Sequence, residues 1–167
     1  IGEIAAAREN VSGISDTVNS RAFYATGLTT SGETYIDTIE YIPFSHSSGA
    51  ATDWGETTEV KKMTATSVTP TDGWITGGVG PGESFKDKIE KYSFSSAGNA
   101  ADTAELSSNL NDHAGHSSST DGFTSGGSDG LATLGDIDKF SFSAPSNSAD
   151  YGELTETKHS CSGADGI

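Results

Sequence analysis

The amino-acid sequence predicts an all-β fold built from repeated four-stranded antiparallel sheets, and three observations support this prediction. One phrase, an Asp-Gly turn followed by an aromatic residue and a glycine pair, occurs at residues 72–78 and again at 121–127. A second recurring phrase alternates side chains with the period of two that is typical of strands. Helical periodicity is almost absent from the chain. The pattern therefore indicates short strands that recur at a fixed interval.

The recurring interval is about 50 residues, a length typical of repeat architectures. Three phrases keep their order in each copy. The first aligns Phe23–Leu28 with Gly73–Gly78 and Gly122–Gly127, the second aligns Ile39–Ser45 with Ile89–Ser95 and Ile137–Ser143, and the third aligns Asp53–Thr57 with Asp102–Leu106 and Asp150–Leu154. In this alignment the first copy has Gly27-Leu28 where the later copies have glycine pairs.

These phrases divide the chain into units at residues 5–57, 58–106 and 107–155, with partial units at 1–4 and 156–167. The segment Asp165–Ile167 resembles the opening of a further copy. Because both ends of the sequence fall inside recurring patterns, we expect a segment of a longer polypeptide, or a chain matured by cleavage.

Each unit is expected to contain four strands. The first two phrases have strand-like composition, the third follows a loop rich in Ser, Asn and Gly, and a further strand must precede Asp72 and Asp121. Four short strands in 40–50 residues are typical of a β-propeller blade, so the sequence predicts about three blades. The structural positions of the repeat are glycines at strand ends and aromatic residues, namely Gly27, Gly77, Gly78, Gly126, Gly127, Phe44, Phe94, Phe142, Trp54 and Tyr151.

These parts resemble kelch repeats, in which a hydrophobic strand ends in a glycine pair and later strands carry paired aromatic residues. Trp74–Gly78, Ile89–Phe94, and Trp54 or Tyr151 carry the resemblance. The sequence of segments 137–155 and 116–127 is similar to tandem repeats in tail-fibre and other virion appendage proteins of marine bacteriophages. This resemblance implies a virion or extracellular location and a structural or host-attachment role.

The charge of the chain excludes several function classes. Twenty-four acidic residues against nine basic ones give a net charge of −15, which repels nucleic acid and anionic membranes. No apolar run reaches the length of a membrane span. Cys161 is the single cysteine, so an internal disulfide is excluded.

No catalytic or metal-binding constellation stands out. His113 and His116 would face opposite sides of a strand. Calcium is the one cofactor left open, because Asp129, Asp136 and Asp138 flank a Gly-rich loop. The acidic residues that recur in the third phrase, Glu3, Glu56, Glu105 and Glu153, suggest a structural role such as pairing between units, since catalytic residues usually break a repeat.

We therefore expect a non-enzymatic structural and adhesion module. Loops 28–38, 79–88 and 128–136 differ most among the copies, and exposed Tyr35, Phe85 and Leu131 are the candidate contact residues. Expected partners are a host surface glycan or protein, other virion or fibre subunits, and further blades of the same polypeptide or a homo-oligomer. A kelch-type protein-protein adaptor, and a secreted propeller enzyme acting on glycans, remain as alternatives.

Overall fold

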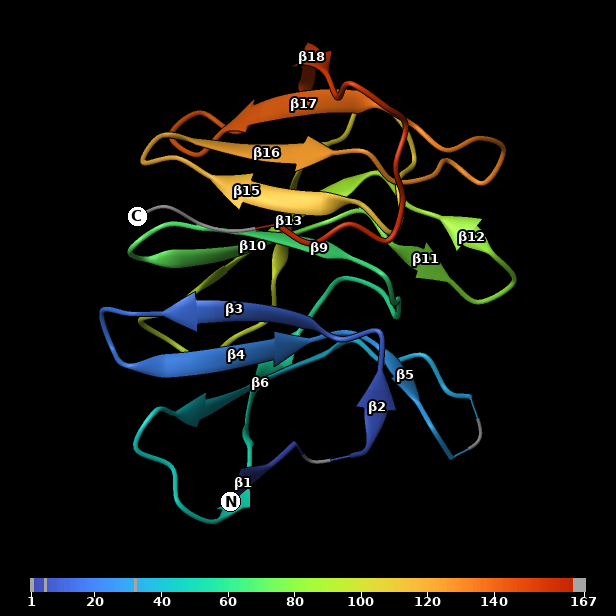
Figure 1. The fold of residues 1–167 in the computed structure, drawn as a ribbon. Coiled ribbons are helices and arrows are strands. Elements are labelled where there is room, and N and C mark those ends of the chain that lie inside the picture. The colour runs from blue at the N-terminus through green and yellow to red at the C-terminus, as the bar shows by residue number, and fades with distance from the viewer. Residues whose placement is uncertain (1, 5, 32, 164–167) are drawn as a thin grey trace.

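The computed structural model describes residues 2–4, 6–31 and 33–163, and these residues form strands and turns without a helix (Figure 1). Three four-stranded antiparallel sheets follow one another along the chain and lie one above the next. This confirms the predicted all-β class and the four-stranded antiparallel sheets. The three sheets do not close into a ring.

Each sheet is a simple meander. The first contains β3 (Ser12–Asp16), β4 (Arg21–Ala25), β6 (Thr38–Pro43) and β8 (Thr52–Glu56); the second contains β9 (Ala65–Val68), β10 (Asp72–Thr76), β13 (Lys88–Ser93) and β14 (Ala101–Glu105); the third contains β15 (Ala114–Ser117), β16 (Asp121–Ser125), β17 (Asp136–Ser141) and β18 (Ala149–Glu153). The strand expected before Asp72 is β9, and the strand expected before Asp121 is β15. The third phrase of the sequence forms the last strand of each sheet.

Short two-stranded ladders lie beside these sheets. β1 (Gly2–Glu3) pairs in parallel with β7 (Gly49–Ala50), β2 (Arg8–Glu9) pairs with β5 (Leu28–Thr29), and β11 (Val79–Gly80) pairs with β12 (Ser84–Phe85). Asp165–Ile167, the segment that resembles a further copy, lies outside the described residues.

The three sheets share one internal register. The ladder between the third and fourth strands is interrupted by a β-bulge at the same place in each sheet, after Ile39, Ile89 and Ile137. A bulge inserts an extra residue and increases the local twist, so its recurrence shows that the units are equivalent in detail.

The register corrects the alignment of the first phrase by one residue. Ala25, Thr76 and Ser125 all pair with the isoleucine that opens the second phrase. Thr26-Gly27 therefore takes the place of the glycine pairs Gly77-Gly78 and Gly126-Gly127. Thr26 has φ 61°, close to 58° at Gly77 and 64° at Gly126, so a β-branched residue adopts the left-handed conformation of a glycine. The first copy thus departs from the glycine pair at Thr26, because Gly27 is the equivalent of Gly78.

The first strands of the three sheets, β3, β9 and β15, lie side by side (Figure 1). Thr66 Oγ1 donates to Gly13 O at 3.1 Å, and Ser67 Oγ donates to His116 O at 2.9 Å. The approach is close: a Cβ atom on Gly115 would lie 2.1 Å from Thr66 O. Small and hydroxylic residues are therefore required where neighbouring sheets meet at this edge.

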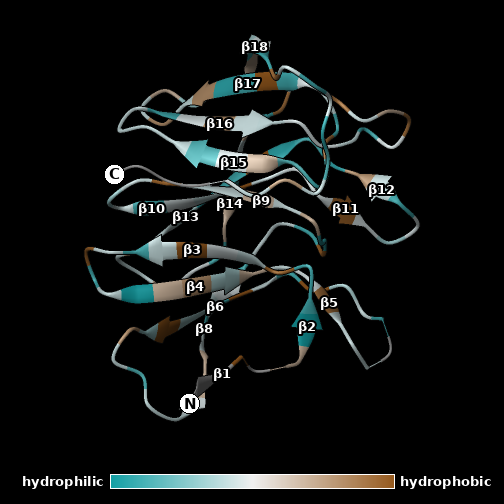
Figure 2. Cartoon of the chain, in the orientation of Figure 1, coloured by the Kyte–Doolittle hydropathy of each residue, from teal (hydrophilic) through white to brown (hydrophobic). Residues whose placement is uncertain are grey.

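The hydrophobic core lies between successive sheets, and Figure 2 shows apolar segments within each of them. We call the packing of the first sheet on the second the first join, and that of the second sheet on the third the second join. Phe94 packs on Phe23 in the first join, with ring centroids 5.2 Å apart. In the second join Phe142, at the same repeat position as Phe94, packs on Trp74 at 5.1 Å. Phe44 holds that position in the first sheet and is 54 % exposed.

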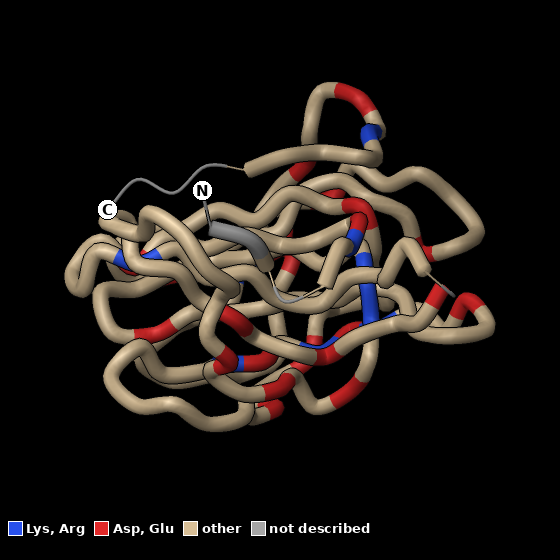
Figure 3. Tube along the Cα trace, turned by 90° about the horizontal axis from the view of Figure 1, so that it is seen from below, with Lys and Arg blue, Asp and Glu red and all other residues tan. Residues whose placement is uncertain are grey.

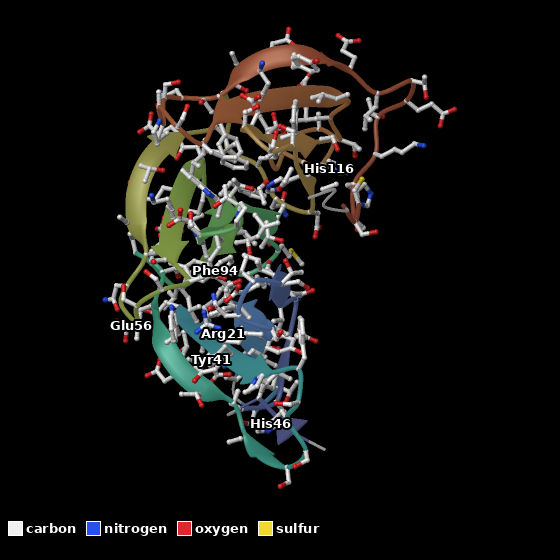
Figure 4. The ribbon with its side chains drawn as sticks, turned by 90° about the vertical axis from the view of Figure 1, so that its left-hand side faces the viewer. Arg21, Tyr41, His46, Glu56, Phe94 and His116 are labelled. Carbon is white, nitrogen blue, oxygen red and sulfur yellow. The ribbon has the colours of Figure 1, made fainter. Side chains whose placement is uncertain are left out.

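Polar contacts also recur at the joins. Asn99 of the second sheet's loop accepts from Glu56 N and donates to Glu56 Oε2. Asn147 makes the same two contacts with Glu105. The side chains of the recurring glutamates 56 and 105 therefore link consecutive units, as the sequence suggested. Figure 4 shows Glu56 at the outer side of the first join.

Buried charges occupy one repeat position in each unit. Glu40, Glu90 and Asp138 follow the bulge in the third strand, and each is at most 6 % exposed. Arg8 pairs with Glu40 at 2.8 Å, Lys61 pairs with Glu90, and the hydroxyls of Ser107 and Ser148 bind Asp138. We call the segment that precedes each sheet a strip: residues 6–11, 57–64 and 106–113. Arg8, Lys61 and Leu110 are equivalent positions in these strips. The second join therefore uses Leu110 and two serines where the first uses a lysine.

The first join contains a second buried ion pair. Arg21 binds Asp16 at 2.6 Å and lies over the Trp54 ring, 4.7 Å from its centroid. It also donates to Phe94 O in the second sheet. Figure 4 shows Arg21 between Tyr41 and Phe94. The guanidinium thus connects the two sheets through both hydrogen bonding and stacking.

Acidic residues are spread along the whole chain (Figure 3). Within the described ranges, the structure contains no helix of the length and apolarity that a membrane crossing requires.

Candidate functional site

The three variable loops project from the same side of the molecule (Figure 1). In each loop, the residue after the equivalent glycines Gly27, Gly78 and Gly127 forms a bridge with a residue further on: Leu28 with Tyr35, Val79 with Phe85, and Ser128 with Thr133. Tyr35, Phe85 and Thr133 are therefore equivalent positions. The aromatic residue recurs in the first two loops and is absent from the third.

A depression of about 180 Å³ lies between the first two loops. Two of the predicted contact residues, Tyr35 and Phe85, come together in its wall, and both are half-buried. The third, Leu131, does not line it and is 96 % exposed in the third loop. The lining residues are Tyr35, Lys62, Met63, Val79, Glu83, Phe85 and Asn111.

The strip between the first and second sheets supplies the floor of the depression. Lys62 exchanges two backbone hydrogen bonds with Val79, at 2.9 and 3.0 Å, which fixes the strip against the second loop. The Lys62 ammonium lies 5.3 Å from the centroid of the Tyr35 ring. This cation–π contact holds the ring and leaves a positive charge at the rim.

Asn111 supplies a buried polar group to the same depression. It is 7 % exposed, its Nδ2 donates to Met63 Sδ at 3.7 Å, and its Oδ1 accepts no hydrogen bond within the described part of the chain. This oxygen has almost no solvent-accessible surface, so it makes the floor of the depression polar but does not face a ligand directly. Two aromatic rings, an amide, a cation and the Glu83 carboxylate together form a binding arrangement.

Phe85 also contacts the third loop. A Cβ atom on Gly130 would lie 2.5 Å from the Phe85 ring, so the loop backbone rests directly on this face of the aromatic side chain. The third loop therefore supports the depression from outside and contributes no lining side chain.

Sequence reasoning missed Lys62, Met63 and Asn111. They lie in the strips between sheets, where neither periodicity nor loop length marks them. Met63 has φ 57° and is equivalent to Asn10, Asp112 and Ser160, all with positive φ. This recurring backbone turn directs the strip under the loops.

A second depression, of about 280 Å³, lies along the row of first strands. Four of its lining residues, Val11, Thr64, His113 and Cys161, are equivalent positions in successive units. His113 is 3 % exposed and its Nε2 lies 2.9 Å from Thr76 Oγ1. The lining is otherwise backbone and small side chains, so this depression follows from the packing of the units.

Burial and the nearby charge of Lys61 lower the pKa of His113 from 6.5 to about 3. The unfolded chain therefore takes up a proton near pH 6.5 while the folded chain stays neutral, so stability falls as the pH decreases from 6.5. We expect a loss of about 2 kcal/mol between about pH 6.5 and pH 5. His113→Thr, which copies Thr64, should remove this slope in urea denaturation. Equal dependence of the free energy of unfolding on pH in His113→Thr and the wild type would contradict this. His159→Thr, at an exposed histidine, is the control and should keep the wild-type dependence.

The other candidate ligands are held by separate contacts. His116 Nε2 lies 3.2 Å from Ser125 Oγ, apart from the contact that His113 makes. Asp129 caps its own loop by accepting from the backbone of Leu131 and Ala132, and Asp138 is buried in the second join. In the described ranges, no three His, Cys, Asp or Glu side chains are placed to hold a metal ion.

Comparison with known proteins gives no assignment: no protein-family model matches the sequence, and no curated protein matches it.

Proposed function

We propose that the three sheets are blades of a kelch-like β-propeller. The common register, the recurring bulge and the row formed by β3, β9 and β15 support this architecture. In a propeller the first strand of each blade lies nearest the axis, and successive blades cover both faces of each sheet.

The function that the loop depression supports best is non-enzymatic adhesion by an extracellular module, such as a virion appendage. The observation that carries this proposal is the convergence of Tyr35 and Phe85 from two units on one depression beside Lys62 and Asn111. The resemblance to virion appendage repeats supports the location, and other appendage subunits are the expected structural partners. The repeated sheets act as a rigid support for the loops.

A surface glycan is the ligand whose chemistry fits this depression. The apolar face of a sugar ring packs on aromatic side chains, and its hydroxyls can donate to the Glu83 carboxylate and accept from the Lys62 ammonium. Because drug-sized ligands occupy pockets of about 300–1,000 Å³, the depression suits one sugar unit of a longer chain rather than a buried oligosaccharide. Lys62 at the rim would attract an anionic sugar, whereas Glu83 would repel it.

Binding to an array of bacterial surface polysaccharides and simple saccharides tests this proposal. Phe85→Ala and Tyr35→Ala should each weaken glycan binding about tenfold or more, since each removes a stacking surface worth over about 1.4 kcal/mol. Leu131→Ala is the matched control, because this loop residue lies outside the depression, and its binding should be unchanged. An array without ligands, or an equal loss with Leu131→Ala, would overturn the proposal. Thermal unfolding of each variant separates loss of binding from loss of fold.

A further inference from the structure

Among the described residues, four large hydrophobic side chains are exposed, and two of them lie on the outer faces of the stack. Phe44 on the first sheet is 54 % exposed, and Tyr151 on the third sheet is 64 % exposed. Their equivalents at the joins are covered: Phe94 is 1 % exposed, and Phe142 and Trp54 are half-buried. Val18 and Leu131, the other two, lie in a turn and a loop away from these faces.

The outer face of the third sheet repeats the surface that the first sheet offers to the second. Phe23 and Trp54 form an edge-to-face contact at 5.5 Å, and Phe94 of the second sheet packs on the Phe23 ring of this pair. Phe123 and Tyr151 form the same contact at 5.5 Å on the third sheet. Lys139 lies over the Tyr151 ring at 5.1 Å. We call Phe123 and Tyr151 the open aromatic pair, because the corresponding ring of a next sheet is not among the described residues.

The strip after the third sheet also follows the path of the earlier strips. Gly27, Gly78 and Gly127 donate their backbone N–H to Lys61, Leu110 and Lys158 O, respectively. Met63 N donates to Asn10 O, Asp112 N to Met63 O, and Cys161 N to Asp112 O, so the lateral hydrogen bonds continue to the end of the described chain. Lys158 is therefore equivalent to buried Lys61, and it is exposed. A strip of this kind ordinarily lies between two sheets.

The outer face of the first sheet has the complementary features. It carries Phe44, the equivalent of Phe94 and Phe142, which pack on Phe23 and Trp74 at the two joins. Ile42 beside it is half-buried, whereas its equivalents Tyr92 and Phe140 are 1 % and 3 % exposed. Glu40 occupies the acidic repeat position on this face, and its carboxylate forms an ion pair with Arg8 of the first strip.

We propose that the outer face of the third sheet binds the outer face of the first sheet of a second copy of this chain. Phe44 of one copy packs on the open aromatic pair of the other, and the contact repeats the two internal joins. The occupant is a second copy because the matching face is present on the same chain. Such a head-to-tail contact either closes a pair of copies or continues as an open string, and both use the same junction.

One exchange accompanies this junction. Residues 2–4 and 6–10 lead into the first sheet, residues 154–160 leave the third, and the two strips hold the same repeat position. Each internal join contains one strip between its two sheets. A junction between two copies therefore keeps one of the two strips in place and displaces the other. The base that meets Glu40 is then Arg8 or Lys158. Association should therefore increase amide hydrogen exchange in one of these two strips and decrease it in the backbone around Phe44 and Tyr151.

Sedimentation velocity of the full chain, from low to high concentration, tests the proposal. We expect association that strengthens with salt, because salt screens the repulsion between two copies of charge −15. Phe44→Asp and Tyr151→Asp should each weaken it about tenfold or more, since each places a carboxylate in a buried aromatic contact. Val18→Asp, at an equally exposed hydrophobic residue, should leave it unchanged.

A mixture of the two variants provides the sharper result. Phe44→Asp keeps an intact open aromatic pair and Tyr151→Asp keeps an intact Phe44, so the mixture should restore one junction and yield 1:1 pairs. A single-copy species at every concentration and salt would overturn the proposal. So would association that survives both substitutions, or that is lost equally with Val18→Asp. Circular dichroism and thermal unfolding confirm that each variant is folded.

Discussion

Glu90→Gln is expected to lower the free energy of unfolding by about 3–5 kcal/mol, because it leaves the Lys61 ammonium buried without its carboxylate. Both side chains are 0 % exposed in the first join. Glu90 also accepts from Thr58 N at 2.6 Å, so the carboxylate serves a backbone donor as well. Urea denaturation at neutral pH measures the loss.

Two further variants show whether burial and pairing cause this loss. Glu59→Gln removes the partner of Lys86 in a pair that is 20 % and 23 % exposed, and should cost about 1 kcal/mol or less. The combination Lys61→Leu, Glu90→Asp, Thr58→Ser and Ala100→Ser gives the first join the residues that the second join uses. It should recover most of the stability lost in Glu90→Gln. A wild-type stability for Glu90→Gln alone would contradict the buried pairing.

Phe94→Ala is expected to cost about 3–5 kcal/mol, the range for deleting a buried aromatic side chain. Phe94 is 1 % exposed and contacts Phe23 at 5.2 Å and Tyr92 at 5.7 Å. Its removal opens a cavity in the aromatic cluster that joins the first two sheets. Thermal or urea unfolding of dilute protein gives the difference.

Phe44→Ala is the matched control for Phe94→Ala. It makes the same chemical change at the same repeat position on an outer face, and should cost less than about 0.5 kcal/mol in dilute solution. Similar losses in both variants would mean that the two phenylalanines have similar surroundings, contrary to the stacked arrangement. Phe142→Ala should fall between them, because Phe142 is half-buried.

The strands and the four-stranded sheets were predictable because local signals mark them. Alternating side chains, Asp-Gly turns and recurring aromatic residues are determined by neighbours in sequence, and the third and fourth strands were placed in correct register. The first phrase was aligned one residue out, because the alignment matched glycine to glycine. Thr26 takes a glycine-like conformation in the structure, and the hydrogen bond between its hydroxyl and Thr64, at 3.1 Å, accompanies this.

The buried charges and half of the site were harder to predict. Lys61 and Glu90 lie in different units, so no local spacing links them, although bases at 8, 61 and 158 and acids at 40, 90 and 138 recur once the units are aligned. Tyr35 and Phe85 could be chosen from loop composition. Lys62 and Asn111 could not, because their places depend on how one unit packs on the next. Leu131 was chosen for exposure alone, and exposure alone does not bring a residue into a depression.

Proton–proton NOEs between successive sheets test the central feature of the structure most directly, namely that each sheet packs on the next through equivalent positions. The structure predicts NOEs from the Phe94 ring to Phe23, from the Phe142 ring to Trp74, and from Gly115 to Thr66. An NOE spectrum in which Phe94 and Phe142 contact only their own sheets, or in which Gly115 shows no NOE to β9, would contradict it.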